Sequence, residues 1–153
     1  MFLPKSVIAC VLALGFTVST ASAAPTMAIR VGPETVPASV DADTRAAFRH
    51  AVTSSITEAG LSPSRAYTAY PSIVQLRRYL EPREKSPTLV CIVSIAVTSD
   101  DVLIATVRGS ATSRGAATRD VLEVATQSAV RGLMKSLESN ERARKRSKPA
   151  AGN

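Results

Sequence analysis

Apolar and polar residues alternate in three stretches of the chain, which is the pattern of β-strands with one buried face. Residues 27–31 form a short example. Residues 89–97 form the strongest one, and residues 102–112 repeat the alternation after the turn-forming residues 99–101. The sequence therefore predicts one short strand near the start and a long antiparallel hairpin over residues 89–112.

The two faces of this hairpin differ in character. Its inner face carries small and apolar side chains, including Val107 and Gly109, which would let a helix lie close to the sheet. On the opposite face Val90 and Ile92 stand among polar residues. We therefore expect the opposite face to be partly covered as well.

Apolar residues three and four positions apart predict a first helix that includes residues 48–59. Ser39 or Asp41 can cap its start, because a side-chain oxygen there can accept a hydrogen bond from a free backbone N–H group. Gly60 marks its end, since glycine readily adopts the left-handed conformation that commonly follows a helix.

A second helix is predicted over residues 116–139, where Leu122, Leu133 and Leu137 lie along one apolar stripe. Gly132 falls in its middle. A glycine there costs up to about 1 kcal/mol relative to alanine, so we interpret Gly132 as a point of close packing.

Residues 67–80 show a less regular pattern. Their alternation favours a strand with an irregular start around Pro71, and a short helix over residues 73–80 is the alternative. Residues 81–87 (EPREKSP) are expected to form a charged loop bounded by prolines.

These elements give the order β-α-β-β-β-α. A helix between two strands suits parallel pairing, whereas short turns suit antiparallel pairing. We therefore predict an α+β fold, with a single mixed sheet of about four strands and two helices packed on one face. Residues 24–140 are expected to form one domain.

The first 23 residues have the layout of an export signal. Lys5 precedes an apolar run over residues 7–18, and Ala21-Ser22-Ala23 offers the small residues that a signal peptidase cuts. The run is shorter than the roughly 20 residues that a spanning helix needs, so we expect cleavage after residue 23 and no transmembrane span in the mature chain. The expected location is periplasmic or secreted.

Two alternatives to simple cleavage stay open. Residues 7–10 (VIAC) resemble the site at which bacterial lipoproteins are cut and acylated on cysteine, here Cys10. An uncleaved anchor is the other alternative. Both are disfavoured, because the long apolar run lies after Cys10 and is too short to span.

Removal of the leader also removes Cys10 and leaves Cys91 as the one thiol of the mature chain. An intramolecular disulfide is then impossible, so packing alone must hold the fold. Cys91 lies in the apolar run of the hairpin, and we interpret it as a small buried hydrophobic residue, with an intermolecular disulfide as the alternative.

The positive charge of the chain is concentrated at its end. Residues 24–140 contain 13 Lys and Arg against 11 Asp and Glu, whereas residues 141–153 contain five against one. This end has no apolar periodicity, so we predict that residues 141–153 form a disordered basic tail. It either aids solubility alone or attaches the chain electrostatically to an anionic surface. The cations of this predicted tail are Arg142, Arg144, Lys145, Arg146 and Lys148.

The composition argues against nucleic-acid binding by the folded part. That part is nearly neutral, and a nucleic-acid footprint needs a basic patch. Tryptophan is absent, and few tyrosine and phenylalanine residues are available to stack on bases.

The sequence offers no recognisable catalytic set. The one histidine, His50, has no acidic partner at a matching helical position, so we interpret it as structural. One histidine and one cysteine do not make a zinc site. Asp100 and Asp101 are adjacent, but a turn explains them without a calcium ion. We therefore expect no enzyme activity, no metal and no cofactor.

Arg108, Arg114 and Arg119 cluster with hydroxyl residues around the junction between the last strand and the last helix. A helix N-terminus with nearby arginines can bind an anion. These three arginines are the candidate anion-binding residues, although helix capping by Ser113 or Thr118 explains the hydroxyl groups equally well.

The order of elements resembles the small periplasmic α+β domains at the N-terminus of TolB and in envelope lipoproteins of the curli-secretion and penicillin-binding-protein-activator kinds. The segments that carry the resemblance are residues 27–31, 48–60, 89–97, 102–111 and 122–137. Those domains usually have a second helix between their early strands, which residues 67–80 would have to hold or replace. The resemblance implies a binding or assembly module without an active site.

The leading hypothesis is therefore an exported, non-enzymatic binding or assembly module of the cell envelope, with an unknown envelope protein or an anionic surface as partner. One alternative is a small hydrolase or anion-binding protein that uses Arg108, Arg114 and Arg119. Another is a protein that binds polyanions or a membrane surface through residues 141–153.

Overall fold

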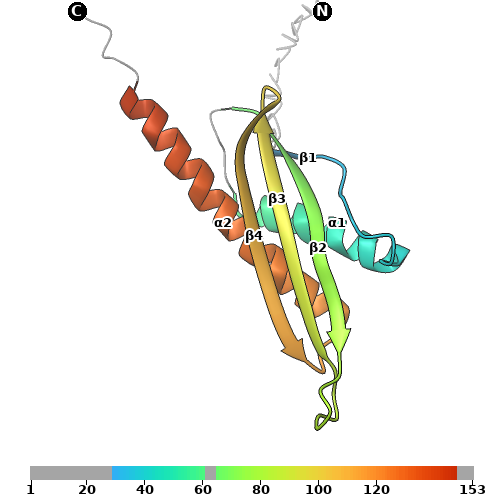
Figure 1. The fold of residues 1–153 in the computed structure, drawn as a ribbon. Coiled ribbons are helices and arrows are strands. Elements are labelled where there is room, and N and C mark those ends of the chain that lie inside the picture. Colours follow the sequence, from blue (N-terminus) through green and yellow to red (C-terminus); the bar gives the residue numbers. More distant parts are fainter. Residues whose placement is uncertain (1–28, 61–64, 148–153) are drawn as a thin grey trace, which may run out of the picture.

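The computed structural model describes residues 29–60 and 65–147 (Figure 1). Its elements are β1 (Ile29–Val31), α1 (Ala42–Glu58), β2 (Tyr67–Tyr79), β3 (Thr88–Ser99), β4 (Val102–Arg114) and α2 (Thr118–Ser147). The four strands form one sheet, and both helices pack on the same face of it. The predicted α+β fold and the order β-α-β-β-β-α are confirmed.

The sheet is mixed and has the strand order β1-β2-β3-β4. β1 is parallel to β2, as the intervening helix requires, and the remaining pairs are antiparallel. The segment after β1 continues along β2: Thr35 N donates to Pro71 O at 2.9 Å, and Ile73 N donates to Thr35 O at 2.9 Å. Residues 27 and 28 of the predicted first strand lie outside the described residues.

Asp41, one of the two predicted caps, starts α1. Its carboxylate accepts a hydrogen bond from Thr44 N at 2.7 Å, which satisfies one of the free N–H groups of the first turn. This hydrogen bond, and a second one that Thr44 Oγ1 donates to Asp41 at 2.9 Å, lower the pKa of Asp41. At the other end Gly60 has a φ of 62°, the left-handed conformation expected after a helix.

Residues 67–79 form a strand, as the favoured interpretation predicted. The register between β2 and β3 shifts between Ile73 and Gln75, so Val74 is the extra residue of a β-bulge. Before the bulge, Ile73 pairs with the buried Val93 and faces the helices. After the bulge, Leu76 pairs with the buried Cys91 and faces the helices in turn. This change of face explains why neither set of alternating residues in the sequence is consistently apolar.

α2 packs closely on β4 at Gly109. A Cβ atom built on Gly109 would lie 2.1 Å from Ala125 O and 2.4 Å from Ala129 N. The interpretation of Gly132 as a point of close packing is wrong. A Cβ atom there would meet Val107 side-chain atoms at 3.8 Å, which is ordinary contact. The close approach is made by the glycine on the strand.

α2 continues to Ser147, so the prediction of disorder is wrong for residues 141–147. Arg, Lys, Glu and Ala are good helix formers, and Arg142 pairs with Glu138 one turn away at 3.4 Å. The basic residues of the last turn also interact favourably with the negative end of the helix dipole. Residues 148–153 lie outside the described residues.

The core lies between the sheet and the two helices. β3 supplies alternate residues from Leu89 to Val97, and α2 supplies its apolar stripe. Within the described ranges, no buried side-chain nitrogen or oxygen lacks a hydrogen-bond partner. The largest fully buried side chains include Phe48, Val52, Val93, Ile95, Val97, Leu122, Leu133 and Leu137.

Candidate functional site

The three arginines of the predicted anion site do not come together. Arg108 and Arg114 lie six positions apart on β4, a separation of about 20 Å along a strand. Both pair with β3 residues on the face away from the helices, Ser94 and Thr88 respectively. Arg119 instead lies in the first turn of α2 and lines a hollow between the helices.

One of these arginines has a partner that accounts for its position. Arg114 forms an ion pair with Glu84 of the loop between β2 and β3, at 3.0 Å. Arg119 lines the hollow between α1 and α2, as do Glu58 and Glu123. The structure therefore offers no shared pocket in which the three guanidinium groups could hold one anion.

The α1–α2 groove is the hollowed part of the helical layer. It consists of two hollows of about 170 and 490 Å³, which share Ser55, Glu58 and Gln127. His50 lines the first, and its Nε2 lies 3.5 Å from Ser54 Oγ. The groove mixes acidic, basic and amide side chains. Ser54 and His50 lie one turn apart on α1, and within the described residues no carboxylate hydrogen-bonds the imidazole to orient it as a base.

The acidic pair Asp100 and Asp101 forms the β3–β4 turn. Their φ angles are 51° and 61°, and the flanking residues Ser99 and Val102 are paired across the strands. A two-residue hairpin loop with two positive φ angles matches the right-handed twist of the strands and favours aspartate. In the described part of the chain no group of three His, Cys, Asp or Glu side chains could hold a metal ion.

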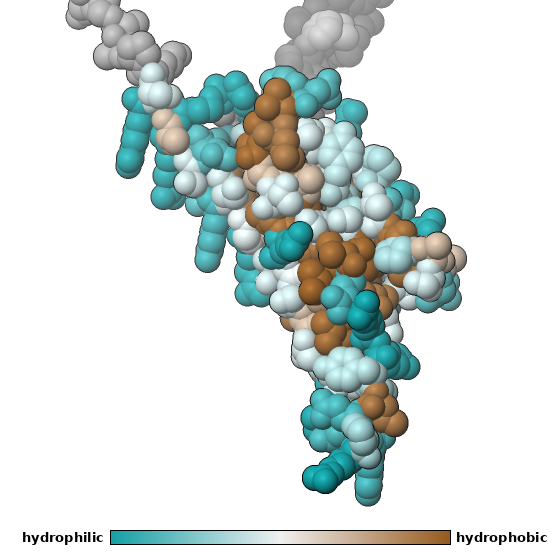
Figure 2. Space-filling model, viewed as in Figure 1, coloured by the Kyte–Doolittle hydropathy of each residue, from teal (hydrophilic) through white to brown (hydrophobic). Residues whose placement is uncertain are grey.

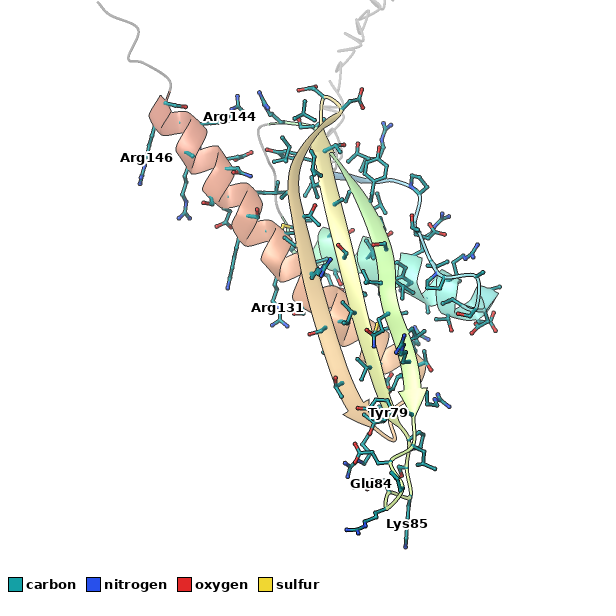
Figure 3. All side chains as sticks on the ribbon, in the orientation of Figure 1. Tyr79, Glu84, Lys85, Arg131, Arg144 and Arg146 are labelled. Carbon is teal, nitrogen blue, oxygen red and sulfur yellow. The ribbon has the colours of Figure 1, made fainter. Side chains whose placement is uncertain are left out.

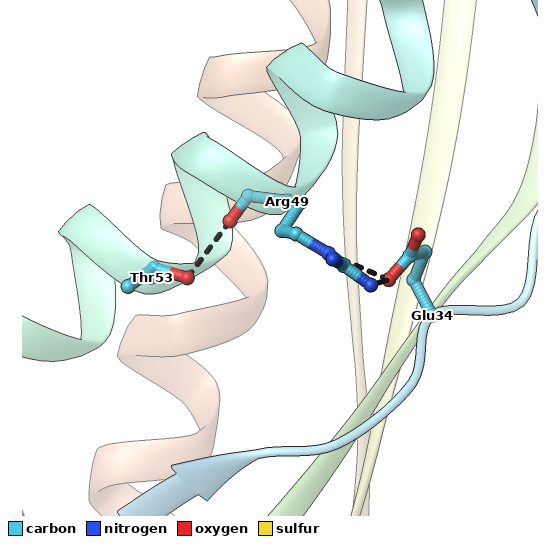
Figure 4. Close-up of polar contacts among 3 residues, drawn as sticks. All are labelled: Glu34, Arg49 and Thr53. Atoms are coloured by element: carbon cyan, nitrogen blue, oxygen red, sulfur yellow. Dashed lines mark hydrogen bonds and ion pairs between the residues drawn. The ribbon is translucent and has the colours of Figure 1, made fainter. Parts of the chain in front are cut away.

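Two carboxylates of the N-terminal half have lowered pKa values, each with a structural cause. One is the capping Asp41, and the other is Glu34. Arg49 donates from Nε to Glu34 Oε2 at 2.9 Å, and this hydrogen bond lowers the pKa of Glu34 (Figure 4). Thr53 Oγ1 donates to Arg49 O at 2.9 Å on the same helix. The pair fastens the segment after β1 to α1, which is a structural role.

Cys91 is free and fully buried, as predicted. Burial raises the pKa of its thiol from the ordinary value of 9.0 to about 11. Because the folded-state pKa is the higher one, the thiol favours the folded state fully below pH 9. This contribution falls as the pH rises from 9 towards 11.

We predict that Cys91 of the native protein hardly reacts with a thiol reagent at pH 8, because the thiolate is the reactive form and the sulfur is inaccessible. In denaturant it should react fully. Comparing labelling with and without denaturant by mass spectrometry checks this. Rapid stoichiometric labelling of native protein would contradict the buried position.

The sheet face away from the helices is the candidate binding surface, and we call it the open sheet face. Its centre is apolar: Val90 and Ile92 of β3 are half-buried, and Val74 of the bulge is 49% exposed. Figure 2 looks at this face and shows apolar surface in its middle. The partial cover expected over Val90 and Ile92 is not supplied by the described residues, since both helices lie on the other side (Figure 1).

Aromatic and cationic side chains surround this apolar centre. Tyr70 lies at one end, 39% exposed, and Tyr79 lies at the other, where Figure 3 labels it. Arg77 of β2 lies opposite Val90 in the strand register, on one side of β3. Arg108 of β4 lies opposite Ser94, on the other side of β3. β2, β3 and β4 contain no Asp or Glu at all. The open sheet face is therefore apolar in the middle and positive around it.

The cations of the predicted tail lie on a helix. Arg142, Arg144, Lys145 and Arg146 are exposed on the last turns of α2, and Lys148 lies outside the described residues. Figure 1 shows that this end of α2 projects beyond the sheet. Within the described ranges, no helix has the length and apolar character to cross a membrane.

Sequence reasoning missed Val74 and Tyr70 as surface residues. The bulge that turns Val74 outwards leaves only a break in alternation, which the sequence shows as ambiguity between strand and helix. Tyr70 is held by the loop after β1, because its ring packs within 3.0 Å of where a Cβ atom on Gly32 would lie. That contact depends on tertiary structure.

No family model matches the chain, and a search of curated proteins by sequence gave no match. The fold is shared with solved structures. A candidate lipoprotein from Caulobacter crescentus superposes with a TM-score of 0.50 at 16% identity, over 81% of this chain and 95% of that chain.

A Xanthomonas campestris protein of the DUF330 family superposes with a TM-score of 0.53 at 7% identity, over 76% of this chain and 87% of that chain. Identities this low show a common fold alone. The predicted resemblance to the TolB N-terminal domain is not shown by these comparisons.

Proposed function

We propose that this protein is an exported, non-enzymatic module of the cell envelope that binds a partner protein on its open sheet face. The observation that carries the proposal is the one-sided cover of the sheet. Both helices pack on one face, and the other face keeps half-buried apolar side chains without cover from the described residues. A face of this composition is typical of protein–protein contact.

The charge of the face indicates the chemistry of the partner. Arg77 and Arg108 flank the apolar centre, and the three long strands lack acidic residues. Complementary potentials favour a partner surface with apolar residues among Asp and Glu. We therefore propose an acidic envelope protein as the occupant.

Two further observations support the envelope role. The leader has the layout of an export signal, and one structure with this fold is a candidate lipoprotein. The described residues with shifted pKa values also support a non-enzymatic role. Asp41 caps a helix, Glu34 forms an ion pair with Arg49, and Cys91 is buried in the core.

The export part predicts a mature chain that begins at Ala24. N-terminal sequencing of the protein recovered from the envelope fraction should therefore read APTMAIR. An intact Met1 would show that the leader is retained, and an acylated Cys10 would show that the chain is a lipoprotein. Either result would overturn simple cleavage.

The binding part is tested by photo-crosslinking in intact cells. A photoreactive residue at Ile92 should give a discrete adduct with one acidic envelope protein, because Ile92 lies in the middle of the open sheet face. The same residue at Glu123, which is exposed on α2 beside the α1–α2 groove and away from the open sheet face, serves as the matched control and should not give this adduct. Absence of an adduct at Ile92, or the same adduct from both positions, would overturn the proposal.

A further inference from the structure

A row of exposed cations follows the outer face of α2. Five residues of the helix fall within an arc of about 100° when its 3.6 residues per turn are applied. Figure 3 shows Arg131 and Arg146 extending from the same side of α2 and Arg144 from the other. We call this row the basic stripe; it consists of Arg131, Lys135, Arg142, Lys145 and Arg146.

The helix dipole accounts for only part of the basic stripe. Cations in the last turn stabilise the C-terminal end of a helix, and this effect fades within one turn. Arg131 and Lys135 lie three or more turns before Ser147, beyond that range. Leu133 and Leu137 face the core, so these two cations lie away from it and are exposed. They border the second hollow of the α1–α2 groove, together with Glu58 and Glu138.

Acidic residues are unevenly placed on this outer face. Asp120 and Glu123 lie near the start of α2, away from the basic stripe. Glu138 lies within the stripe and pairs with Arg142 at 3.4 Å, but both side chains are more than half exposed. Such a pair screens the stripe only weakly. Glu141 is the other acidic residue of this half and lies one turn before Lys145. Residues 131–147 therefore hold six Lys or Arg against two Glu, and this half of the helix is positive overall.

We propose that the basic stripe docks this protein on an anionic lipid-bilayer surface. The stripe follows the helix axis for about 22 Å, which is 15 steps of 1.5 Å from Arg131 to Arg146. Its cations share one side of the helix. This arrangement suits a flat layer of headgroups better than a flexible polymer, which would contact cations around the whole helix. It contains no large apolar side chain, so α2 lies on the headgroups by charge alone and does not insert.

The geometry makes this contact compatible with partner binding. The core-facing side of α2 packs on the sheet, and the basic stripe lies on the other side of the helix. The open sheet face lies beyond the sheet, so the two surfaces face away from one another. A molecule docked by the basic stripe presents the open sheet face away from the bilayer.

Vesicle binding of the mature chain tests the proposal. Retention is measured on vesicles of phosphatidylcholine with phosphatidylglycerol, on phosphatidylcholine alone, and on soluble polyphosphate, each at low and high salt. Wild-type protein should bind the anionic vesicles at low salt and lose them at high salt, since charge attraction is screened. It should not bind phosphatidylcholine alone.

The double variant Arg131→Gln/Lys135→Gln should bind the anionic vesicles about 25-fold more weakly, since each cation near such a surface contributes about fivefold. The control Arg83→Gln/Lys85→Gln removes the same charge from the β2–β3 loop. Figure 3 labels Lys85 of this loop, at the far end of the molecule from the stripe. It should bind like wild type. Circular dichroism verifies that both variants fold.

Equal binding by the two double variants would overturn the proposal, because net charge and not the stripe would then be responsible. Binding to polyphosphate with the same dependence on Arg131 and Lys135, and no binding to vesicles, would assign the stripe to a polymer instead. None of these assays involves the open sheet face. Their result is therefore independent of the crosslinking result at Ile92, and either proposal can fail alone.

Discussion

Replacing Gly109 by alanine is expected to destabilise the protein by about 3 kcal/mol or more. The added Cβ would fall 2.1 Å from Ala125 O and 2.4 Å from Ala129 N, and both are backbone atoms of α2. A flexible side chain could move aside, but here the helix itself must shift away from the sheet. Overpacking of a well-packed core typically costs about 1–3 kcal/mol, and a backbone clash belongs at or above the top of that range.

Gly132→Ala is the matched control, because it adds the same methyl group on the other side of the same contact. The nearest atoms to the new Cβ are those of Val107, at 3.8 Å. Alanine also has the better helix propensity, so the free energy of unfolding should stay equal or rise by up to about 1 kcal/mol. Urea unfolding of both variants measures the difference. Similar losses for both would contradict the packing of α2 on β4.

Leu133→Ala is expected to cost about 2–4 kcal/mol. Leu133 is fully buried on the core side of α2, and its truncation leaves a cavity. Lys135→Ala, two positions along the same helix, is the control; its side chain is exposed, so the change should be within about 0.5 kcal/mol. Chemical unfolding of the two variants gives the comparison. A loss of only a few tenths of a kcal/mol for Leu133→Ala would show that the core face of α2 is assigned wrongly.

Local signals in the sequence predicted most of the fold. The cap at Asp41, the stop at Gly60 and the β3–β4 turn each depend on residues close in sequence, and periodicity revealed the buried faces of β3 and α2. Features that depend on distant contacts were not predictable. Which glycine mediates close packing is decided by how α2 crosses β4, and the sequence cannot distinguish Gly109 from Gly132 on that point.

The candidate sites show the same division. Arg108, Arg114 and Arg119 are close in sequence, but alternation along β4 sets two of them on the open sheet face. Gly115, with a φ of 70°, then turns the chain towards the helical layer and carries Arg119 with it. The basic residues after Asn140 lack an apolar stripe, and the sequence therefore predicts a tail there. Their helical phase becomes apparent only once α2 is seen to continue past Asn140.

A charge-swap experiment, in which a cation of this protein and the facing acid of its crosslinked partner exchange signs, tests the binding role of the open sheet face most directly. Arg108 lies beside Ile92 on this face, in the neighbouring row of the β3–β4 register. Arg108→Glu should reduce binding of the partner more than tenfold, and changing the facing acid of the partner to arginine should restore it. Lys85→Glu, on the distant loop, should leave binding unchanged. Unaltered binding by Arg108→Glu, with the Ile92 adduct still formed, would contradict an acidic partner seated on this face.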